Sequence, residues 1–404
     1  MRTGTANAYD NALQNLYTRQ SNLASQQEKL TSGKSINRPS DDPTGAALAE
    51  RALTRITRIA TEQRALGNQS SSITLAESTL GDASNLMQSI RDLVVSAGNG
   101  GLNASDRTSK AQEMQGLRDQ LFTLANRTDS NGTPLFGGLG SASVPFTMSG
   151  GVVTFNGIAG QKASTDTTLP GAMDGQAIWM NVRSGNGNFD VALGSNSGSL
   201  STDTGQVISP TALTGHDYSV NFSVNSTVSP SVTTYSVVDS TTATTVVPVA
   251  PATAPTFVPD QAIQFDGISF ATHGTPAQGD SVQITQSTQT NVFSILDNAI
   301  AGIKGAPSSN VVSQTVALAL SQIDAGMSQI QAARGQAGEW LNHADRIISA
   351  QDGRTLQLTT DKSRAEDIDM VKAYSEFTTM KSGYEAAMQS YAQIQKLSLF
   401  NYIS

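Results

Sequence analysis

Apolar side chains in the helical parts of this chain recur every three or four residues, the spacing of one face of an α-helix. The longest uninterrupted run comprises Ile73, Ala76, Leu80, Ala83, Met87, Ile90, Val94 and Ala97. Such a seam needs a partner helix, because an isolated helix cannot bury its apolar face. Residues 43–97 are therefore predicted to form one helix, about 80 Å long at 1.5 Å per residue.

The C-terminal part of the chain carries the same repeat. A helical pattern resumes near Asn291, breaks at residues 305–309, and continues from Val316 to Ile348. A final segment keeps the spacing to residue 394. Because helical segments occupy both ends of the chain, we expect the first and last helices to pair antiparallel.

The middle of the chain has a different character. Residues 138–290 contain nine Asp, no Glu and two basic residues, and short stretches such as Tyr218 to Val224 alternate apolar and polar side chains. Alternation of this kind, bounded by Gly, Pro and Asn-Gly turns, indicates short antiparallel strands. In "VDSTTATTVVPVAPATAP" the valines favour strand plus loop, with a disordered linker as the alternative.

These patterns predict a multidomain α and β protein. The N- and C-terminal halves pair as long antiparallel helices, with a mostly antiparallel β domain inserted between them. We expect terminal coiled-coil assembly helices at 1–34 and 362–404, disordered in the monomer. A helical rod domain is expected at 35–137 and 292–361, and an outward-facing β domain at 138–291.

The terminal seams are thinner than the central one. Gln20 and Gln27 fall at core positions of the first helix, and Ala373 and Ala387 at those of the last. We expect such helices to order only against neighbouring copies, because ordering a residue costs about 1 to 2 kcal/mol. An ordinary intramolecular coiled coil is the alternative. The predicted self-assembly positions are Leu13, Leu16, Leu23, Leu30, Met370, Phe377, Met380, Tyr384, Tyr391 and Ile394.

A connector follows the first helix in "LTSGKSINRPSDDPTGAALAERA". Its Gly33-Lys34-Ser35 resembles the end of a phosphate-binding loop, but the first glycine of that motif would stand at Glu28, and a helix replaces the required strand. Instead, Gly33 suits a helix end, and Asp42 suits an N-cap before Pro43. The charged side chains of the connector, Lys34, Arg38, Asp41 and Asp42, are predicted either to be solvated or to contact another subunit.

No catalytic, cofactor-binding or metal-binding set is recognisable. The chain has no Cys, and its three histidines, His216, His273 and His343, lack metal-ligand spacing. The acidic clusters at 41–42 and 366–369 lack the pattern of a calcium loop, and no Ser lies in G-x-S-x-G. An acidic chain, with a net charge of −8, is also a poor match for nucleic acid. These observations predict a protein that is not an enzyme.

The N-terminal residues contain no apolar signal-peptide core, and the sequence has no run of about 18 apolar residues. We therefore expect no membrane insertion. An extracellular protein of this kind would leave the cell by another route.

Several stretches resemble the bacterial flagellin superfamily. They are "KLTSGKSINRPSDDPTGAALA" at 29–49, "LRDQLFTLANRTDSNGTPLFGG" at 117–138, "IQFDGISFATHGTPAQGDSVQI" at 263–284 and "IQKLSLFNYIS" at 394–404. Within that superfamily, "NRPSDDP" at 37–43 is more similar to hook–filament junction proteins than to flagellin. The resemblance covers both helical halves and the edges of the middle segment.

The resemblance implies a structural protein that assembles as a ring in the extracellular flagellum. The implied partners are further copies of itself, the first hook-associated protein, flagellin and an export chaperone, and the implied route is the flagellar type III channel. Flagellin itself is one alternative. A β-rich adhesin or hydrolase on a helical stalk is the other, and a pocket with convergent polar groups would be its mark.

Overall fold

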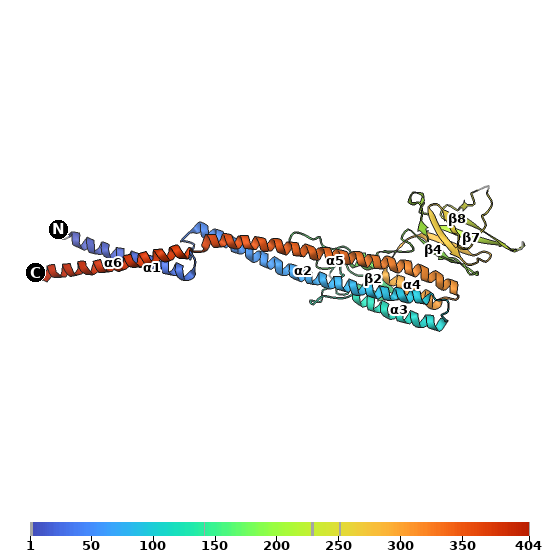
Figure 1. Ribbon diagram of the computed structural model, residues 1–404, viewed down its shortest axis with the longest axis horizontal. Helices are drawn as coiled ribbons and strands as arrows, with labels where there is room; N and C mark the ends of the chain where they lie inside the picture. Colours follow the sequence, from blue (N-terminus) through green and yellow to red (C-terminus); the bar gives the residue numbers. More distant parts are fainter. Residues whose placement is uncertain (1–2, 141, 228–229, 250–251, 404) are drawn as a thin grey trace. The chain divides into compact units, whose positions relative to one another are not determined.

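The computed structural model describes residues 3–140, 142–227, 230–249 and 252–403 (Figure 1). Its α-helices are α1 Thr3–Ser32, α2 Pro43–Ala97, α3 Ala104–Ala125, α4 Val292–Gly305, α5 Ser309–Glu366 and α6 Met370–Ile403. The predicted bounds 43–97, the restart after Asn291 and the break before Ser309 are confirmed. The predicted class, paired helices from both halves with a mostly antiparallel β domain between them, is also confirmed.

The helix ends follow local side-chain chemistry. The side chain of Asn103 caps α3 by accepting a hydrogen bond from the backbone N–H of Asp106, and the Asp106 carboxylate accepts one from the backbone N–H of Asn103. The side chain of Asn291 caps α4 by accepting from the backbone N–H of Ser294 at 2.8 Å. Gly33, directly after α1, has φ of +68°, the left-handed conformation that glycine adopts without steric cost.

The chain forms two compact units, residues 1–65 with 346–404 and residues 66–345. The first unit holds α1, α6, the start of α2 and the end of α5. The second holds the rest of α2 and α5, with α3, α4 and all the strands. The three-part division expected from the sequence stays a prediction.

In the second unit, the helical seams are closed. Leu80, Met87, Ile90 and Val94 of α2 are fully buried, as is Ile323 of α5. This repeat therefore forms a dry core, the outcome expected when several helices cover one another's apolar faces.

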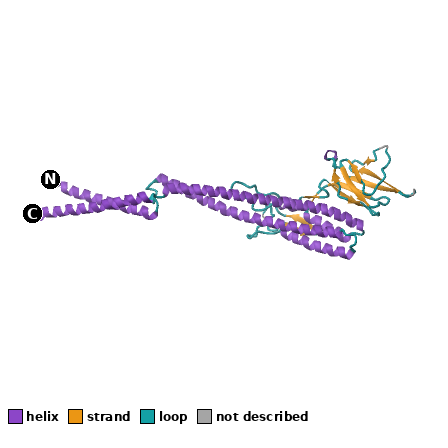
Figure 2. Ribbon diagram, viewed as in Figure 1, coloured by secondary structure: helices purple, strands orange, loops and turns teal. Residues whose placement is uncertain are grey.

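Strands fall into two groups in the second unit (Figure 2). The bounds are β1 Phe146–Ser149, β2 Val152–Phe155, β3 Val182–Arg183, β4 Phe189–Leu193, β5 Ser201–Thr202, β6 Gln206–Val207, β7 Tyr218–Asn225, β8 Val232–Asp239, β9 Thr244–Val247, β10 Ala262–Phe265, β11 Ile268–His273, β12 Ser281–Gln286 and β13 Gln289–Thr290. A π-helix, Gln176–Met180, and a 3₁₀ turn, Pro210–Ala212, lie among them.

The β domain consists of two antiparallel sheets. One has the order β4-β12-β7-β8-β9, and the other has β10-β11-β5 with β6 also paired to β11. Their buried faces share one core, to which Tyr218, Val220 and Phe222 of β7 contribute on alternate positions. The alternation seen in the sequence therefore marks the inward face of a central strand.

A two-stranded stem joins the β domain to the helices. Val182 pairs with Thr290, and Arg183 pairs with Gln289, so the chain enters and leaves at adjacent points. On the surface of α5, Gln314 accepts bonds from the backbone and hydroxyl of Thr202 at 2.6 and 2.9 Å. The β domain therefore rests on α5 through polar contacts.

The segment before the stem packs with the helices instead. The ring of Trp179 lies 5.7 Å from that of Phe136 and 5.9 Å from that of Phe293 on α4, and Phe146 also contacts Phe293. All four rings are fully buried. Part of the non-helical middle thus completes the helical core.

Arg118 of α3 is the largest charged side chain in that core, with 1% of its surface exposed. Its Nη2 donates to Oδ2 of Asp297 on α4 at 2.8 Å. The guanidinium carbon also lies 5.5 and 5.8 Å from the ring centres of Phe293 and Phe122. This buried cation thereby links two helices that are far apart in the sequence.

We predict that Arg118→Ala destabilises the second unit by about 3 kcal/mol or more, because it leaves Asp297 without its partner and opens a cavity. Urea unfolding followed by circular dichroism measures the change. Asp119 is an exposed carboxylate that also pairs with Arg118. Asp119→Asn is therefore the control, and it should alter stability by less than about 0.5 kcal/mol. An equally small effect of Arg118→Ala would contradict a structural role for the buried cation.

Candidate functional site

The terminal helices form an antiparallel pair. Tyr391 of α6 donates to the hydroxyl of Tyr9 of α1 at 2.5 Å, and Gln26 donates to the carbonyl of Ala373 at 3.2 Å. Early residues of α1 therefore lie beside late residues of α6, and Figure 1 shows both chain ends at the same end of this pair. The hydrogen bond from Tyr391 to Tyr9 also raises the pKa of Tyr391 to about 12.

The seam between these helices is only partly covered. The predicted positions Leu13, Leu16, Leu23, Leu30, Phe377, Tyr384 and Tyr391 are half-buried. Met370 and Met380 are exposed, at 53% and 37% of their surface. The side chain of Ile394 lies outside the described residues. Unlike the central seam, this one has lost only part of its contact with water.

The glutamines in this pair differ from expectation. Gln20 and Gln27 are exposed, so the assignment of both to core positions was wrong. Gln26 reaches α6 instead, because its long polar side chain lies along the edge of the interface and finds a backbone acceptor there. Ala373 is buried, as expected of a small seam residue.

Backbone and side-chain contacts hold the connector to the end of α5 and to the residues that follow it. Ser35 donates its backbone N–H to the carbonyl of Glu366 at 2.7 Å, and Ile368 donates to the carbonyl of Gly33 at 3.1 Å. Lys34 forms an ion pair with Glu366, and this hydrogen-bonded pairing lowers the pKa of Glu366 and raises that of Lys34. Lys34 therefore contacts a carboxylate of its own chain.

The acidic residues of the connector are engaged in shaping it. Asp42 accepts hydrogen bonds from the backbone N–H groups of Thr44 and Gly45, both at 3.0 Å, and so caps α2 as predicted. Asp41 accepts two more, from Asn37 and Arg38, and these bonds lower its pKa. A contact of these carboxylates with another subunit stays a prediction.

Arg38 differs from its acidic neighbours. Its side chain is 72% exposed, and its nearest carboxylate, that of Glu28, lies 3.8 Å away. Of the predicted connector residues, Arg38 is the one whose charge is directed mainly at solvent.

Each histidine has a side-chain partner that the sequence did not reveal. His216 lies 2.7 Å from Asp239, His273 lies 2.5 Å from Asp260, and His343 lies 2.7 Å from the hydroxyl of Ser164. The residues of each pair are 13 to 179 positions apart, so spacing could not identify them. Among the described residues, no group of three His, Cys, Asp or Glu side chains is placed to hold a metal ion.

Asp239 is the most strongly held of these carboxylates. Burial by itself raises its pKa, but hydrogen bonds from the backbone of Thr242 and from His216 outweigh burial and lower the pKa to about 2. The unfolded value is about 3.9. Stability contributed by this group is therefore complete above about pH 4 and is lost as the pH falls toward 2.

The comparisons with known proteins match both ends of the chain. Residues 4–141 match the bacterial flagellin N-terminal helical region, and residues 320–403 match the bacterial flagellin C-terminal helical region. Together these matches cover more than half of the chain. The chain belongs to the bacterial flagellin family.

One hook-associated protein matches this chain over almost its full length. Flagellar hook-associated protein 3 of Escherichia coli K12 is 24% identical over 99% of both chains. The Salmonella typhimurium protein of the same name is 33% identical, but the match covers 37% of this chain and 48% of that protein. Flagellin of Bacillus subtilis is 35% identical over 32% of this chain and 43% of its own length.

Solved structures give the same grouping. The flagellar hook-associated protein 3 from Legionella pneumophila has a TM-score of 0.72 at 26% identity, covering 78% of this chain and 98% of that one. FlgL from Xanthomonas campestris has a TM-score of 0.68 at 29% identity, covering 78% of this chain and 99% of that one.

None of the described helices combines the length and apolar character needed to cross a membrane.

We predict that Asp239→Asn lowers the melting temperature of the β domain at pH 7, because the neutral side chain loses the charge that its donors stabilise. The variant should also lose less stability than the unaltered chain between pH 4 and pH 2. Thermal melting at several pH values tests both effects. Asp166→Asn, at an exposed position, is the control and should melt like the unaltered chain; the same pH dependence in all three proteins would contradict this role of Asp239.

Proposed function

We propose that this chain is a structural junction protein of the bacterial flagellum, joining the hook, through the first hook-associated protein, to the flagellin filament. One observation carries the proposal: the similarity to hook-associated protein 3 spans 99% of both chains. The flagellin match covers about a third of this chain. A filament subunit is therefore the second candidate, since it shares the terminal helices.

Self-association through α1 and α6 is the proposed mechanism. Their seam is half-buried in a single chain, whereas the seam of α2 is fully buried. Burying an exposed large apolar side chain stabilises by roughly 1.5 to 3 kcal/mol. Neighbouring copies that cover the terminal seam therefore supply a gain that the isolated chain lacks, and on this account both ends are mobile in the monomer.

The export route from the cell and the remaining partners are part of the same proposal. Export through the flagellar type III channel, with a chaperone covering the apolar termini before assembly, suits a chain that has no Cys and whose ends expose tyrosines and methionines. Arg38 is proposed to contact an adjacent subunit, since its charge is the least engaged of the connector. A structural role also accords with the family, and we propose no enzymatic activity.

Deletion of the gene tests the junction role. Cells that lack this chain should retain complete hooks, produce no attached filaments and release filament protein into the medium. Electron microscopy of the hooks and immunoblotting of the medium measure these outcomes. Hooks that carry normal filaments would overturn the proposal, and loss of filament protein from both cells and medium would favour the filament subunit instead.

A shortened chain, used to complement that deletion, locates the function. Replacing residues 184–288 by a short Gly/Ser turn joins Arg183 to Gln289, which are paired neighbours in the stem, and keeps Trp179 in the helical core. Because the terminal helices are untouched, the shortened chain should restore filaments. A stable, exported product that restores none would move the function to the β domain.

A further inference from the structure

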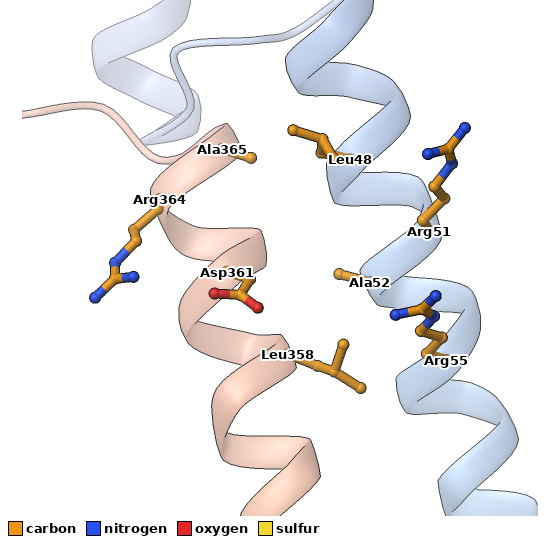
Figure 3. Close-up of a pocket in the computed structure, with 8 residues that line it drawn as sticks. All are labelled: Leu48, Arg51, Ala52, Arg55, Leu358, Asp361, Arg364 and Ala365. Atoms are coloured by element: carbon orange, nitrogen blue, oxygen red, sulfur yellow. The ribbon is translucent and has the colours of Figure 1, made fainter.

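A groove with an unusual combination of side chains lies between α2 and α5 in the first unit. It has a volume of about 490 Å³ and is lined by Leu48, Arg51, Ala52, Arg55, Leu358, Asp361, Arg364 and Ala365 (Figure 3). The apolar side chains face the space between the helices, whereas Arg51 and Arg364 point outward on either side. The groove thus has an apolar floor and a charged rim.

The floor is open because this part of the helix pair is held together by small side chains. Ala49 and Ala52 of α2 are buried, but Leu48, next to them, is 53% exposed. Alanines let the helices approach without covering a leucine on the flank of the seam. An exposed leucine in a groove adds apolar surface that another protein can cover.

The rim carries charge that the chain itself does not neutralise. Within the described residues, none of the guanidinium groups of Arg51, Arg55 and Arg364 lies within 4 Å of a carboxylate. Arg58, by comparison, pairs with Glu62 on the same helix. The rim therefore offers three planar cations, and Asp361 adds a single negative charge beside them.

The start of α6 has the complementary combination. Met370, Val371 and Tyr374 are 53%, 83% and 66% exposed, and their spacing places them together on one side of the helix. Asp367 and Asp369 precede them in the sequence, whereas Lys372, two residues from both Met370 and Tyr374, lies on another side of the helix. One carboxylate oxygen of Asp369 accepts bonds from the backbone of Val371 and Lys372, while the other has no partner among the described residues.

We infer that the groove receives the start of α6 from a second copy of this chain. The apolar patch of Met370, Val371 and Tyr374 covers Leu48 and Leu358, while Asp367 and Asp369 approach the arginines. The negative charge beside the patch thus matches the positive charge of the rim. The inference rests on the proposed self-association and names a contact for it outside the α1–α6 seam.

The contact joins two different surfaces of the same unit. A reciprocal exchange, in which each copy fills the groove of the other, closes as a two-fold dimer. When each copy instead binds one neighbour through its groove and another through its patch, the contact is heterologous and generates rings if the rotation closes and filaments if it does not. A ring, which the family resemblance implies, needs the second arrangement.

Cross-linking tests the inference, and the absence of Cys from the chain makes every disulfide informative. Two variants, Leu48→Cys and Val371→Cys, are expressed together in the deleted cells, and are also purified separately and mixed at high concentration. Mild oxidation should give a dimer that contains both variants, and much less dimer from either variant alone. Leu356→Cys, at an exposed leucine outside the groove, replaces Leu48→Cys as the control and should give little mixed dimer.

Charge reversal provides an independent readout. Arg51→Glu combined with Arg55→Glu should weaken self-association of the purified chain at least tenfold in sedimentation velocity, with unchanged circular dichroism. Arg346→Glu combined with Arg354→Glu applies the same change of charge to exposed arginines outside the groove and should weaken association less than threefold.

The outcomes separate this inference from the proposed function. Filaments that form without the mixed disulfide, or a Leu48→Cys dimer as abundant as the mixed one, would overturn the groove contact and leave the junction role intact. A chain that does not self-associate in solution or in isolated flagella would overturn the contact as well. Normal filaments in the deleted cells would overturn the junction role. Cross-linking and sedimentation of the purified proteins would still test the groove contact in that case.

Discussion

The fold depends on one requirement: an apolar helix seam has to be covered by another surface. In the second unit that requirement is met within the chain, where α2, α3, α4 and α5 leave Leu80, Met87, Ile90 and Val94 fully buried. In the first unit the same kind of repeat is covered by a single partner helix, and its leucines and tyrosines stay half-buried. The second unit, whose seam is closed, is therefore a stable scaffold. The first unit, whose seam is open, leaves apolar surface available to other molecules.

The order of the chain follows from this division. The terminal helices pair only because the chain turns back, so the segments between them must return the C-terminal half to the N-terminal half. The β domain is inserted through a stem of two short strands, β3 and β13, whose ends are adjacent. Such an insertion leaves the pairing of the flanking helices unchanged. Meanwhile the segment before the stem contributes Phe146 and Trp179 to the core beside α4.

Much of this architecture was predictable, because helix periodicity and capping are local. Residues 43–97 form the expected helix, Asp42 caps it as expected, and the alternation from Tyr218 marks a central strand. The burial of Arg118 was not predictable, because a charged side chain on a helix is usually solvated. Its burial is favourable only because α3 and α4 together supply a carboxylate, that of Asp297, and two aromatic rings. The histidine pairs were missed for the same reason.

The candidate site was predictable in part. The repeat identified the terminal seams, but it placed Gln20 and Gln27 in a core from which the structure excludes them. It also gave no sign of the groove beside Leu48, because that groove arises where alanines bring α2 and α5 together. A seam read from one helix shows which residues face a partner, while the size of the partner's side chains decides what remains exposed.

Amide hydrogen exchange, measured on the dilute monomer and on isolated flagella, tests the central claim most directly. We expect rapid exchange along α1 and α6 in the monomer, slow exchange of the central part of α2 in both states, and strong protection of α1 and α6 only after assembly. Strong protection of α1 and α6 in the dilute monomer would contradict it, because the terminal seam would then be closed within a single chain.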